Sequence, residues 1–374
     1  MEATETVSPS HRHQAAVTRS LLSVQRRRRG WLIVWFVTLL LATLILIQSL
    51  HDSGRIGFGF VNWRPLLYAY LLWSIALGWS QILIRGDRGR KALFILPAAL
   101  FTLAVVVFPT VFGLSIAFTN WNLSSFHGRQ FNGIENFIDL LHDSNYANAL
   151  LNMVYYTLAV PVEYAVAFAL ALALNAEIRA RRFFRVVFLL PFMLSPIAVS
   201  WMVGKSLMET RFGPIASLAR WLGWENPMFF SSPWIARASI EAMDAWAWIP
   251  FMMIMMLAGL QALPKEIKEA AAVDGANRWQ NFWLITFPLL LPVSVTAITL
   301  RIIFKLKLAD IVINVTDGAP GGATDTVTSY IFRVYRDRSN VGYGTMLAMA
   351  YLVIIIVLIT LLLKFANGRI RRLT

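Results

Sequence analysis

The chain has 374 residues, of which 57% are hydrophobic and only 14% are charged, and its mean hydropathy is +0.60. A soluble fold of this length has too little interior to bury so much apolar surface, so the composition excludes a soluble globular protein. The absence of cysteine excludes disulfides, thiolate metal sites and cysteine nucleophiles. The net charge of +14 does not indicate nucleic-acid binding, because Lys and Arg gather at the ends of apolar segments, as membrane topology requires.

Eight stretches of the chain are long and apolar enough to cross a bilayer, which takes about 20 mostly apolar residues in a helix. Seven of them carry no charge, and one contains a single acid, Glu163. In chain order the stretches are 31–50, 66–84, 92–121, 147–175, 186–204, 245–263, 282–300 and 341–363. Core helices of a soluble protein could account for one such run but not for eight. We therefore predict an all-α integral membrane protein with eight transmembrane helices.

Basic residues predict the orientation of these helices. With the amino terminus in the cytoplasm, the inner loops and tails hold 21 Lys and Arg residues and the outer loops hold nine, so both termini are predicted to be cytoplasmic. The first helix follows four arginines at 26–29 and has no small-residue cleavage site near its end, which indicates a retained signal anchor. The predicted domains are a cytoplasmic tail (1–30), a two-helix extension (31–91), a six-helix core (92–366) and a second cytoplasmic tail (367–374).

One inner loop, 264–281, has a pattern of its own. Glu266 and Glu269 lie in the first turns after Pro264, where the helix dipole favours acids. Three alanines at 270–272 are strong helix formers, and Gly275 is a natural stop. The pattern predicts a short cytoplasmic helix, a glycine break and a second helix that leads into the membrane. Composition alone leaves two interpretations open, an element that docks on a partner and an amphipathic helix that lies on lipid.

The same segment resembles the EAA motif of binding-protein-dependent ABC permeases. That motif reads Glu-Ala-Ala, three residues, Gly, nine residues, Ile, one residue, Leu-Pro. The positions in register here are Glu269, Ala270, Ala271, Gly275, Ile285 and Pro288, and the one departure is Phe287 in place of Leu. The resemblance favours docking on a partner. It implies that the loop 264–288 couples the permease to an ATPase, with Glu269 as the anchor and Ala270, Ala271 and Gly275 as shape-determining positions. Asp274 offers a second charge that can orient the helix.

The resemblance extends over about residues 93–363 and points to the MalF-like branch of sugar permeases, with a type I ABC permease core of six helices. It implies a chain in a bacterial inner membrane that translocates a sugar or oligosaccharide by alternating access and is no enzyme itself. The implied partners are a second related permease, favoured to be a different chain, two ATP-binding cassette subunits and a periplasmic or extracellular solute-binding protein. It also implies that the chain binds no cofactor, because ATP and Mg are used by the partner subunits.

Polar and aromatic residues near the outer ends of the sixth and seventh predicted helices are candidates for the substrate pathway. Acids beside indoles suit sugar binding or, equally, placement at the membrane interface. The candidates are Glu241, Asp244, Trp246, Trp248, Arg301, Lys305, Asp310 and Asn314.

Arg301 and Lys305 are four residues apart and so share a helix face, which would suit an anionic substrate such as a uronate saccharide. In the alternative interpretation Lys305 and Lys307 reach the outer headgroups, while Arg301 pairs with an acid. For Glu163, in the middle of a helix, a buried structural pair is favoured.

Other classes of protein lack support in the sequence. Gly204-Lys205-Ser206 ends like a phosphate-binding loop, but that pattern needs glycine at position 199, which is Val199. The five histidines show no metal-ligand spacing, and no Gly-x-Ser-x-Gly element occurs. A membrane glycosyl transferase needs clusters of carboxylates or histidines at a membrane face, and the acids here are sparse. A stand-alone secondary transporter needs no Glu-Ala-Ala loop.

Overall fold

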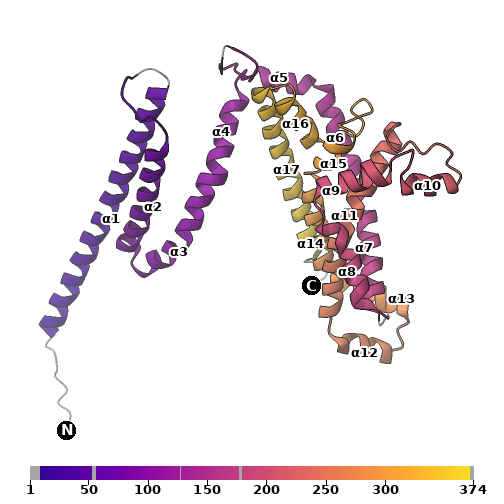
Figure 1. The fold of residues 1–374 in the computed structure, drawn as a ribbon. Helices are drawn as coiled ribbons and strands as arrows, with labels where there is room; N and C mark the ends of the chain where they lie inside the picture. The colour runs from indigo at the N-terminus through magenta and orange to yellow at the C-terminus, as the bar shows by residue number, and fades with distance from the viewer. Residues whose placement is uncertain (1–8, 53–55, 127, 177–178, 371–374) are drawn as a thin grey trace, which may run out of the picture. The chain divides into compact units, whose positions relative to one another are not determined.

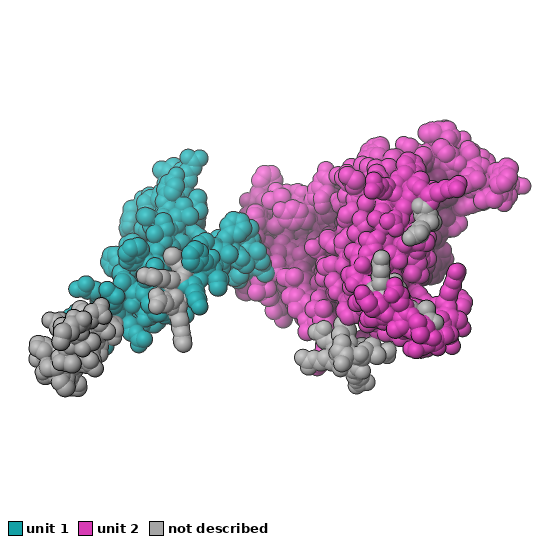
Figure 2. Space-filling view, turned by 90° about the horizontal axis from the view of Figure 1, so that it is seen from below, with its two compact units in different colours: residues 1–112 teal, residues 113–374 magenta. Residues whose placement is uncertain are grey.

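The computed structural model describes residues 9–52, 56–126, 128–176 and 179–370 (Figure 1). Regular structure in these ranges is helical, apart from two isolated bridge pairs, Thr119 with Phe131 and Asn122 with Asn340. The prediction of an all-helical protein is therefore confirmed. The chain forms two compact units, residues 1–112 and residues 113–374 (Figure 2). The predicted domain boundary after residue 91 stays a prediction.

The first unit is built on a helical hairpin. Its elements are α1 (Pro9–Asp52), α2 (Arg64–Arg85), α3 (Asp87–Thr102), the π-helix η1 (Leu103–Val107) and the start of α4 (Phe108–Ala117). The indole Nε1 of Trp73 donates to Thr38 Oγ1 at 3.0 Å and ties α2 to α1. The hydroxyl of Tyr70 donates to the carbonyl of Leu100 at 2.7 Å and ties α2 to α3. Most other side chains on these helices are apolar and exposed, as lipid-facing surfaces require.

The second unit holds the remaining elements. They are α5 (Glu135–His142), α6 (Ser144–Leu158), α7 (Val160–Asn175), α8 (Arg181–Met193), α9 (Pro196–Val199), η2 (Ser200–Leu207), α10 (Pro214–Trp221), α11 (Pro233–Ala262), α12 (Lys265–Val273), α13 (Arg278–Asn281), η3 (Phe282–Thr286), α14 (Phe287–Lys305), α15 (Asp310–Val315), α16 (Val327–Arg336) and α17 (Val341–Ile370). Within this unit α12 lies at one end, and α5 and α16 lie at the opposite end (Figure 1).

Seven helical segments in the described residues are long and apolar enough to cross a membrane. They are Val24–His51, Arg64–Arg85, Phe94–Ala117, Ser144–Asn175, Pro233–Ala262, Arg278–Lys305 and Val341–Phe365. Each overlaps one of the eight predicted stretches. The chain is thus a multi-pass membrane protein by the length and composition of its helices.

The remaining stretch, 186–204, is not the single continuous helix that its hydropathy predicts. The chain bends by 97° between Arg181–Met193 and Pro196–Leu207. Leu194 and Ser195 are extended, because a residue that precedes proline is driven out of the helical region and Pro196 starts the next helix. Ser195 Oγ accepts from the Ala198 N–H at 3.2 Å and caps the new helix. The described chain reaches eight spans only if this bent pair is one of them.

One of three hydrophobic core clusters in the described part of the second unit lies where α11 packs against α7 and α14. Ala167 and Ala171 of α7 pack in one cluster with three methionines of α11, and all five side chains are fully buried. The methionines are Met252, Met253 and Met256. Gly259 lets α14 approach closely, since a Cβ at that position would lie 2.9 Å from Leu290. This tight contact positions the polar side chains that the three helices carry.

Candidate functional site

The predicted coupling loop has the predicted local structure. Helix α12 ends at Val273, and Gly275 follows with φ of +79°, a conformation that favours glycine. The N–H of Ala276 closes the turn by donating to the carbonyl of Ala271 at 2.9 Å. Glu269 and Asp274 are exposed, whereas Ala271 is buried. The helix and the residue after its end therefore present the carboxylates of Glu266, Glu269 and Asp274 on the surface, and Ala271 faces the protein.

A continuous helical path joins this loop to α14. Asn277 and Gln280 form reciprocal caps at 2.8 Å and start α13. The π-helix η3 follows without a break and runs into α14. Phe282, at the start of η3, packs 5.5 Å from Phe168 of α7 between ring centroids. The part of the loop that follows Gly275 is thus continuous with a helix of the core.

Five ionisable side chains meet inside the second unit, where α7, α11 and α14 pack together. We call them the charge cluster. They are Glu163 of α7, Glu241 and Asp244 of α11, and Arg301 and Lys305 of α14. The side chains of Arg301 and Lys305 are 0% exposed, and Glu241, the most accessible of the five, is 13% exposed.

Every member of the charge cluster has an oppositely charged partner. Arg301 Nε and Nη2 lie 2.5 and 2.8 Å from the two oxygens of Glu163, and Nη2 also contacts Asp244. Lys305 Nζ lies 2.9 Å from Glu163, 2.7 Å from Glu241 and 2.5 Å from Asp244. Oxygens of the three carboxylates lie within 4.8 Å of one another, a spacing that could hold a metal ion. The ammonium of Lys305 takes that central position instead.

The charge cluster decides between several sequence interpretations. The predicted buried pair of Glu163 and the pairing of Arg301 with an acid are both confirmed. The prediction that Lys305 reaches outer headgroups is wrong, because α14 directs it at acids of α7 and α11. Arg301 and Lys305 are both neutralised by carboxylates, so neither is free for an anionic substrate, contrary to the argument that proposed a uronate. Glu241 lies in the cluster and not on an open outer mouth.

A cavity of about 290 Å³ lies beside the charge cluster, near the size of the smallest ligand pockets. Asp244 lines it as well as belonging to the cluster, and Lys307 and Asp310 add charges at its wall. Trp248 and Phe304 also line it, with stacked rings whose centroids are 4.5 Å apart. The guanidinium carbon of Arg301 lies 5.4 Å from the centroid of the Trp248 ring, and this cation–π contact helps to hold the indole in place.

The other predicted pathway residues lie elsewhere. Trp246 lines a separate apolar groove of about 950 Å³ that is formed by η2, α10 and α11. Asn314 donates its amide to the carbonyl of Asp310 at 2.8 Å, within α15. Only Asp244, Trp248 and Asp310 of the eight candidates line the cavity. The sequence argument did not select Phe192, Phe304 and Lys307 as pathway residues. Proximity to Asp310 in the sequence was a signal for Phe304 and Lys307, whereas no local signal pointed to Phe192.

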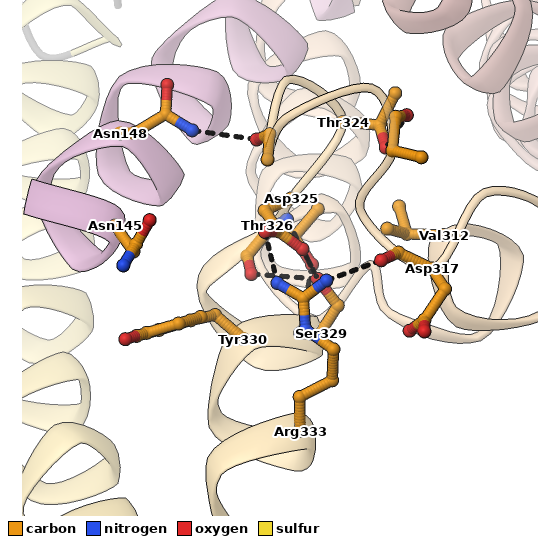
Figure 3. A network of polar contacts seen from close by, with 12 residues as sticks. Asn145, Asn148, Val312, Asp317, Thr324, Asp325, Thr326, Ser329, Tyr330 and Arg333 are labelled. Atoms are coloured by element: carbon orange, nitrogen blue, oxygen red, sulfur yellow. Dashed lines mark hydrogen bonds and ion pairs between the residues drawn. The ribbon is translucent and has the colours of Figure 1, made fainter. Parts of the chain in front are cut away.

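The glycine-rich segment at 318–324, between α15 and α16, is held by a network of polar contacts (Figure 3). Arg333 contacts the carboxylate of Asp325 and the carbonyl of Asp317. The amide of Asn148 donates to the carbonyl of Gly322 at 2.7 Å. A side chain at Gly318 would collide with Arg333 and Asp325. Burial raises the pKa of Asp325 above its ordinary value, although Arg333 opposes that shift.

Comparison with known proteins identifies the family. The family model for the inner membrane component of binding-protein-dependent transport systems matches residues 165–372. The sulfoquinovosyl glycerol transport system permease protein SmoG of Agrobacterium fabrum is 32% identical over 72% of this chain and 88% of its own. The trehalose/maltose transport system permease protein MalF of Thermococcus litoralis is 30% identical over 75% of this chain and 94% of its own.

A solved structure shares the fold. It is that of a bacterial alginate ABC transporter in complex with an alginate pentasaccharide-bound periplasmic protein. One of its chains is 22% identical, with a TM-score of 0.62 over 83% of this chain and 98% of that one. The sequence relatives, the family model and the membrane-spanning helices agree. The chain therefore belongs to the binding-protein-dependent transport system inner membrane components, the permease subunits of ABC importers, and within them to the MalF-like sugar permeases.

Proposed function

We propose that this chain forms half of the pathway through which an ABC importer carries a saccharide across the bacterial inner membrane, driven by ATP hydrolysis on separate subunits. The observation that carries the proposal is the coupling loop. An exposed short helix that carries acids is followed by a glycine turn, and a continuous helical segment then enters the core of the unit. A stand-alone secondary transporter or a membrane glycosyl transferase has no use for such an element.

The proposed coupling works through a rigid lever. The ATPase cleft holds α12, with Glu269 and Asp274 orienting it and Ala270 and Ala271 giving it a low profile. Gly275 shapes the turn that follows. When ATP closes the ATPase dimer, α12 moves. It carries η3 and α14 with it, because only the short turn at 274–277 separates α12 from the continuous helical segment that starts at α13. That motion switches the pathway from one side of the membrane to the other.

The proposed assembly has two permeases, two ATP-binding subunits and a soluble binding protein outside. The alginate transporter structure supports the last partner, because that transporter, which contains a chain of this fold, is in complex with a periplasmic protein. The distribution of Lys and Arg supports a cytoplasmic position for both termini and for α12. The bent pair of α8 and η2 is then the fifth of eight spans.

The cavity beside the charge cluster is the proposed substrate contact in this chain. Asp244 and Asp310 can accept hydrogen bonds from sugar hydroxyls, and Trp248 can pack on a sugar ring. The charge balance favours an uncharged saccharide, because the buried cations are already paired with acids. A uronate-type or other anionic saccharide is the second candidate. Lys307 at the cavity wall and the substrates named for SmoG and the alginate transporter favour it.

Reconstitution of the whole importer in liposomes tests the proposal. We expect substrate-stimulated ATP hydrolysis to require this chain and to fall at least severalfold in Glu269→Ala. Glu266→Ala, in the first turn of the same helix, is the matched control and should retain stimulation. Uptake of neutral and uronate saccharides by the same vesicles then decides the charge of the substrate. Solute movement by this chain alone, or normal coupling in Glu269→Ala, would overturn the proposal in favour of a secondary transporter.

A further inference from the structure

The charge cluster has an unbalanced count of charges. It joins three carboxylates, Glu163, Glu241 and Asp244, to two cations, Arg301 and Lys305. With all five groups ionised, the cluster has a net charge of minus one. A buried charge without a counter-charge is strongly disfavoured in a protein interior and more so within a bilayer.

The cluster is buried between membrane-spanning helices, toward the ends of α11 and α14 that lie away from α12, because Lys305 is the last residue of α14. Asp244 is 18 residues before Ala262 on α11, which is about 27 Å along the helix from the end next to α12. Glu163 lies about 18 Å from the end of α7 at Asn175 by the same measure. Four of the five side chains are almost completely buried. Water therefore screens the excess charge poorly.

Neighbouring groups in the described part of the chain do not supply the missing positive charge. Arg237, one turn before Glu241 on α11, is only partly buried, and its Nε donates to Asn152 and to the carbonyl of Ala323. Lys307 is exposed, and its ammonium lies 6.0 Å from the Phe304 ring. Tyr156 of α6, whose hydroxyl donates to the carbonyl of Thr324, is neutral. A metal ion does not fit, because Lys305 Nζ already lies within 2.9 Å of an oxygen of each carboxylate.

We propose that the charge cluster is a proton-binding site, which holds one proton among its three carboxylates at neutral pH and is electrically neutral in that state. The proton exchanges with water through Glu241, the most accessible member, and its release leaves one more ionised carboxylate. The site does not depend on the identity of the transported substrate. Because the folded chain holds a proton that an unfolded carboxylate releases at neutral pH, the stability of the fold declines as the pH rises.

Infrared spectroscopy of the purified chain tests the proposal directly, since a protonated carboxyl group and an ionised carboxylate absorb in different regions. Neutralising any one acid of the cluster leaves two negative and two positive charges, so no proton is then needed. We expect Glu241→Gln, Glu163→Gln and Asp244→Asn each to lose the signal of one protonated carboxyl per molecule at neutral pH. Glu225→Gln replaces an exposed acid outside the cluster and is the control, which should keep the signal of the protonated carboxyl group.

Thermal unfolding in detergent at increasing pH gives a second readout. The melting temperature of the native chain should fall toward alkaline pH, and the fall should be smaller in Glu241→Gln. The three infrared variants are expected to give the same result, so if one of them fails to fold, the other two still test the proposal. Protonated-carboxyl signals that are unchanged from the native chain in the folded variants would overturn the proposal. An alkaline decline in stability that is equal in the native chain and Glu241→Gln would overturn it as well.

Discussion

Acidic side chains occupy two opposite settings in the second unit. In the charge cluster, Glu163 and Asp244 are buried and are bound by Arg301 and Lys305. In the coupling loop, Glu269 on α12 and Asp274 just after it are exposed at the end of the same unit. The chemical groups are alike, but a substitution of Glu163 or Asp244 is expected to disturb the packing of three helices. A substitution of Glu269 or Asp274 is expected to change the free energy of unfolding little.

This contrast separates stability from function in the molecule. Removal of one partner of a buried ion pair costs about 3–5 kcal/mol, because the other charge is left without compensation. Substitution of an exposed side chain usually changes stability by less than about 0.5 kcal/mol. Substitutions in the charge cluster should therefore alter the melting temperature first, and substitutions in the coupling loop should alter ATP hydrolysis first.

The largest effect is expected from Arg301→Met, which leaves three carboxylates with one cation. We expect a loss of about 3–5 kcal/mol in the free energy of unfolding, measured by denaturant or thermal unfolding in detergent. The double variant Arg301→Met with Glu163→Gln should recover part of that loss, because it also removes an unpaired acid. If Arg301→Met alone were as stable as the native chain, the cluster would not hold α7, α11 and α14 together.

A smaller effect is expected from Asp143→Asn, at the start of α6. Burial opposes ionisation of Asp143, but hydrogen bonds from Tyr343 and Tyr330, at 2.6 and 2.7 Å, and from two backbone N–H groups outweigh it and lower its pKa. We expect a loss of about 1–3 kcal/mol, since bonds to the charged carboxylate are weakened or lost.

The pH dependence of that loss has a definite sign. A carboxylate whose pKa is lowered on folding stabilises the protein above the ordinary aspartate range, and this contribution is lost as the pH falls through that range. The native chain should therefore lose more stability than Asp143→Asn on acidification. Parallel acid titrations of the two proteins, followed by intrinsic fluorescence, measure the difference, and identical titrations would contradict the assignment.

Gly275→Ala probes the backbone of the coupling loop. Alanine at a φ of +79° is strained by about 1–2 kcal/mol, so we expect a modest fall in stability together with weaker substrate-stimulated ATP hydrolysis. Gly57→Ala, at an exposed glycine of the first unit where an added Cβ meets nothing within 4 Å, is the comparison. Equal stimulation in both variants would show that the shape of the turn does not matter for coupling.

The smallest stability effect is expected from Glu269→Ala. Its side chain is exposed, and alanine is a good helix former. The free energy of unfolding should therefore change by less than about 0.5 kcal/mol, which a nearly unchanged melting temperature would show. The same variant is the one expected to lose stimulation of ATP hydrolysis. A large loss of stability would place Glu269 in the packing of the unit and would remove the contrast between the two regions.

Local patterns were sufficient to predict much of this fold. Apolar runs predicted seven of the membrane-crossing segments, and the spacing of Glu269 and Gly275 predicted a short helix with a glycine stop. The bend at Leu194 was missed because hydropathy counts apolar residues and ignores the effect of Pro196 on the residue before it. The Ser195-Pro196 pair was a readable signal for that break.

The substrate-pathway candidates show where sequence reasoning stops. Trp246 and Trp248 are neighbours in the sequence, but two residues turn a helix by about 200°, so they face different surfaces. Only Trp248 reaches the cavity beside Asp244. Sequence distance predicts which helix a side chain is on, and the rotation of that helix against its neighbours decides what the side chain contacts.

Reading the residues in order was enough to predict that the chain spans a membrane, where most of its helices run, and that one loop has the spacing of an ATPase-coupling element. Those properties depend on residues close together in the chain, through hydrophobicity, capping and glycine conformation. In contrast, the contact of Glu163 with Arg301, 138 residues away, and the position of Lys305 among three acids became visible in the folded chain alone. Such partners are selected by the close packing of α7, α11 and α14, and no local pattern encodes that packing.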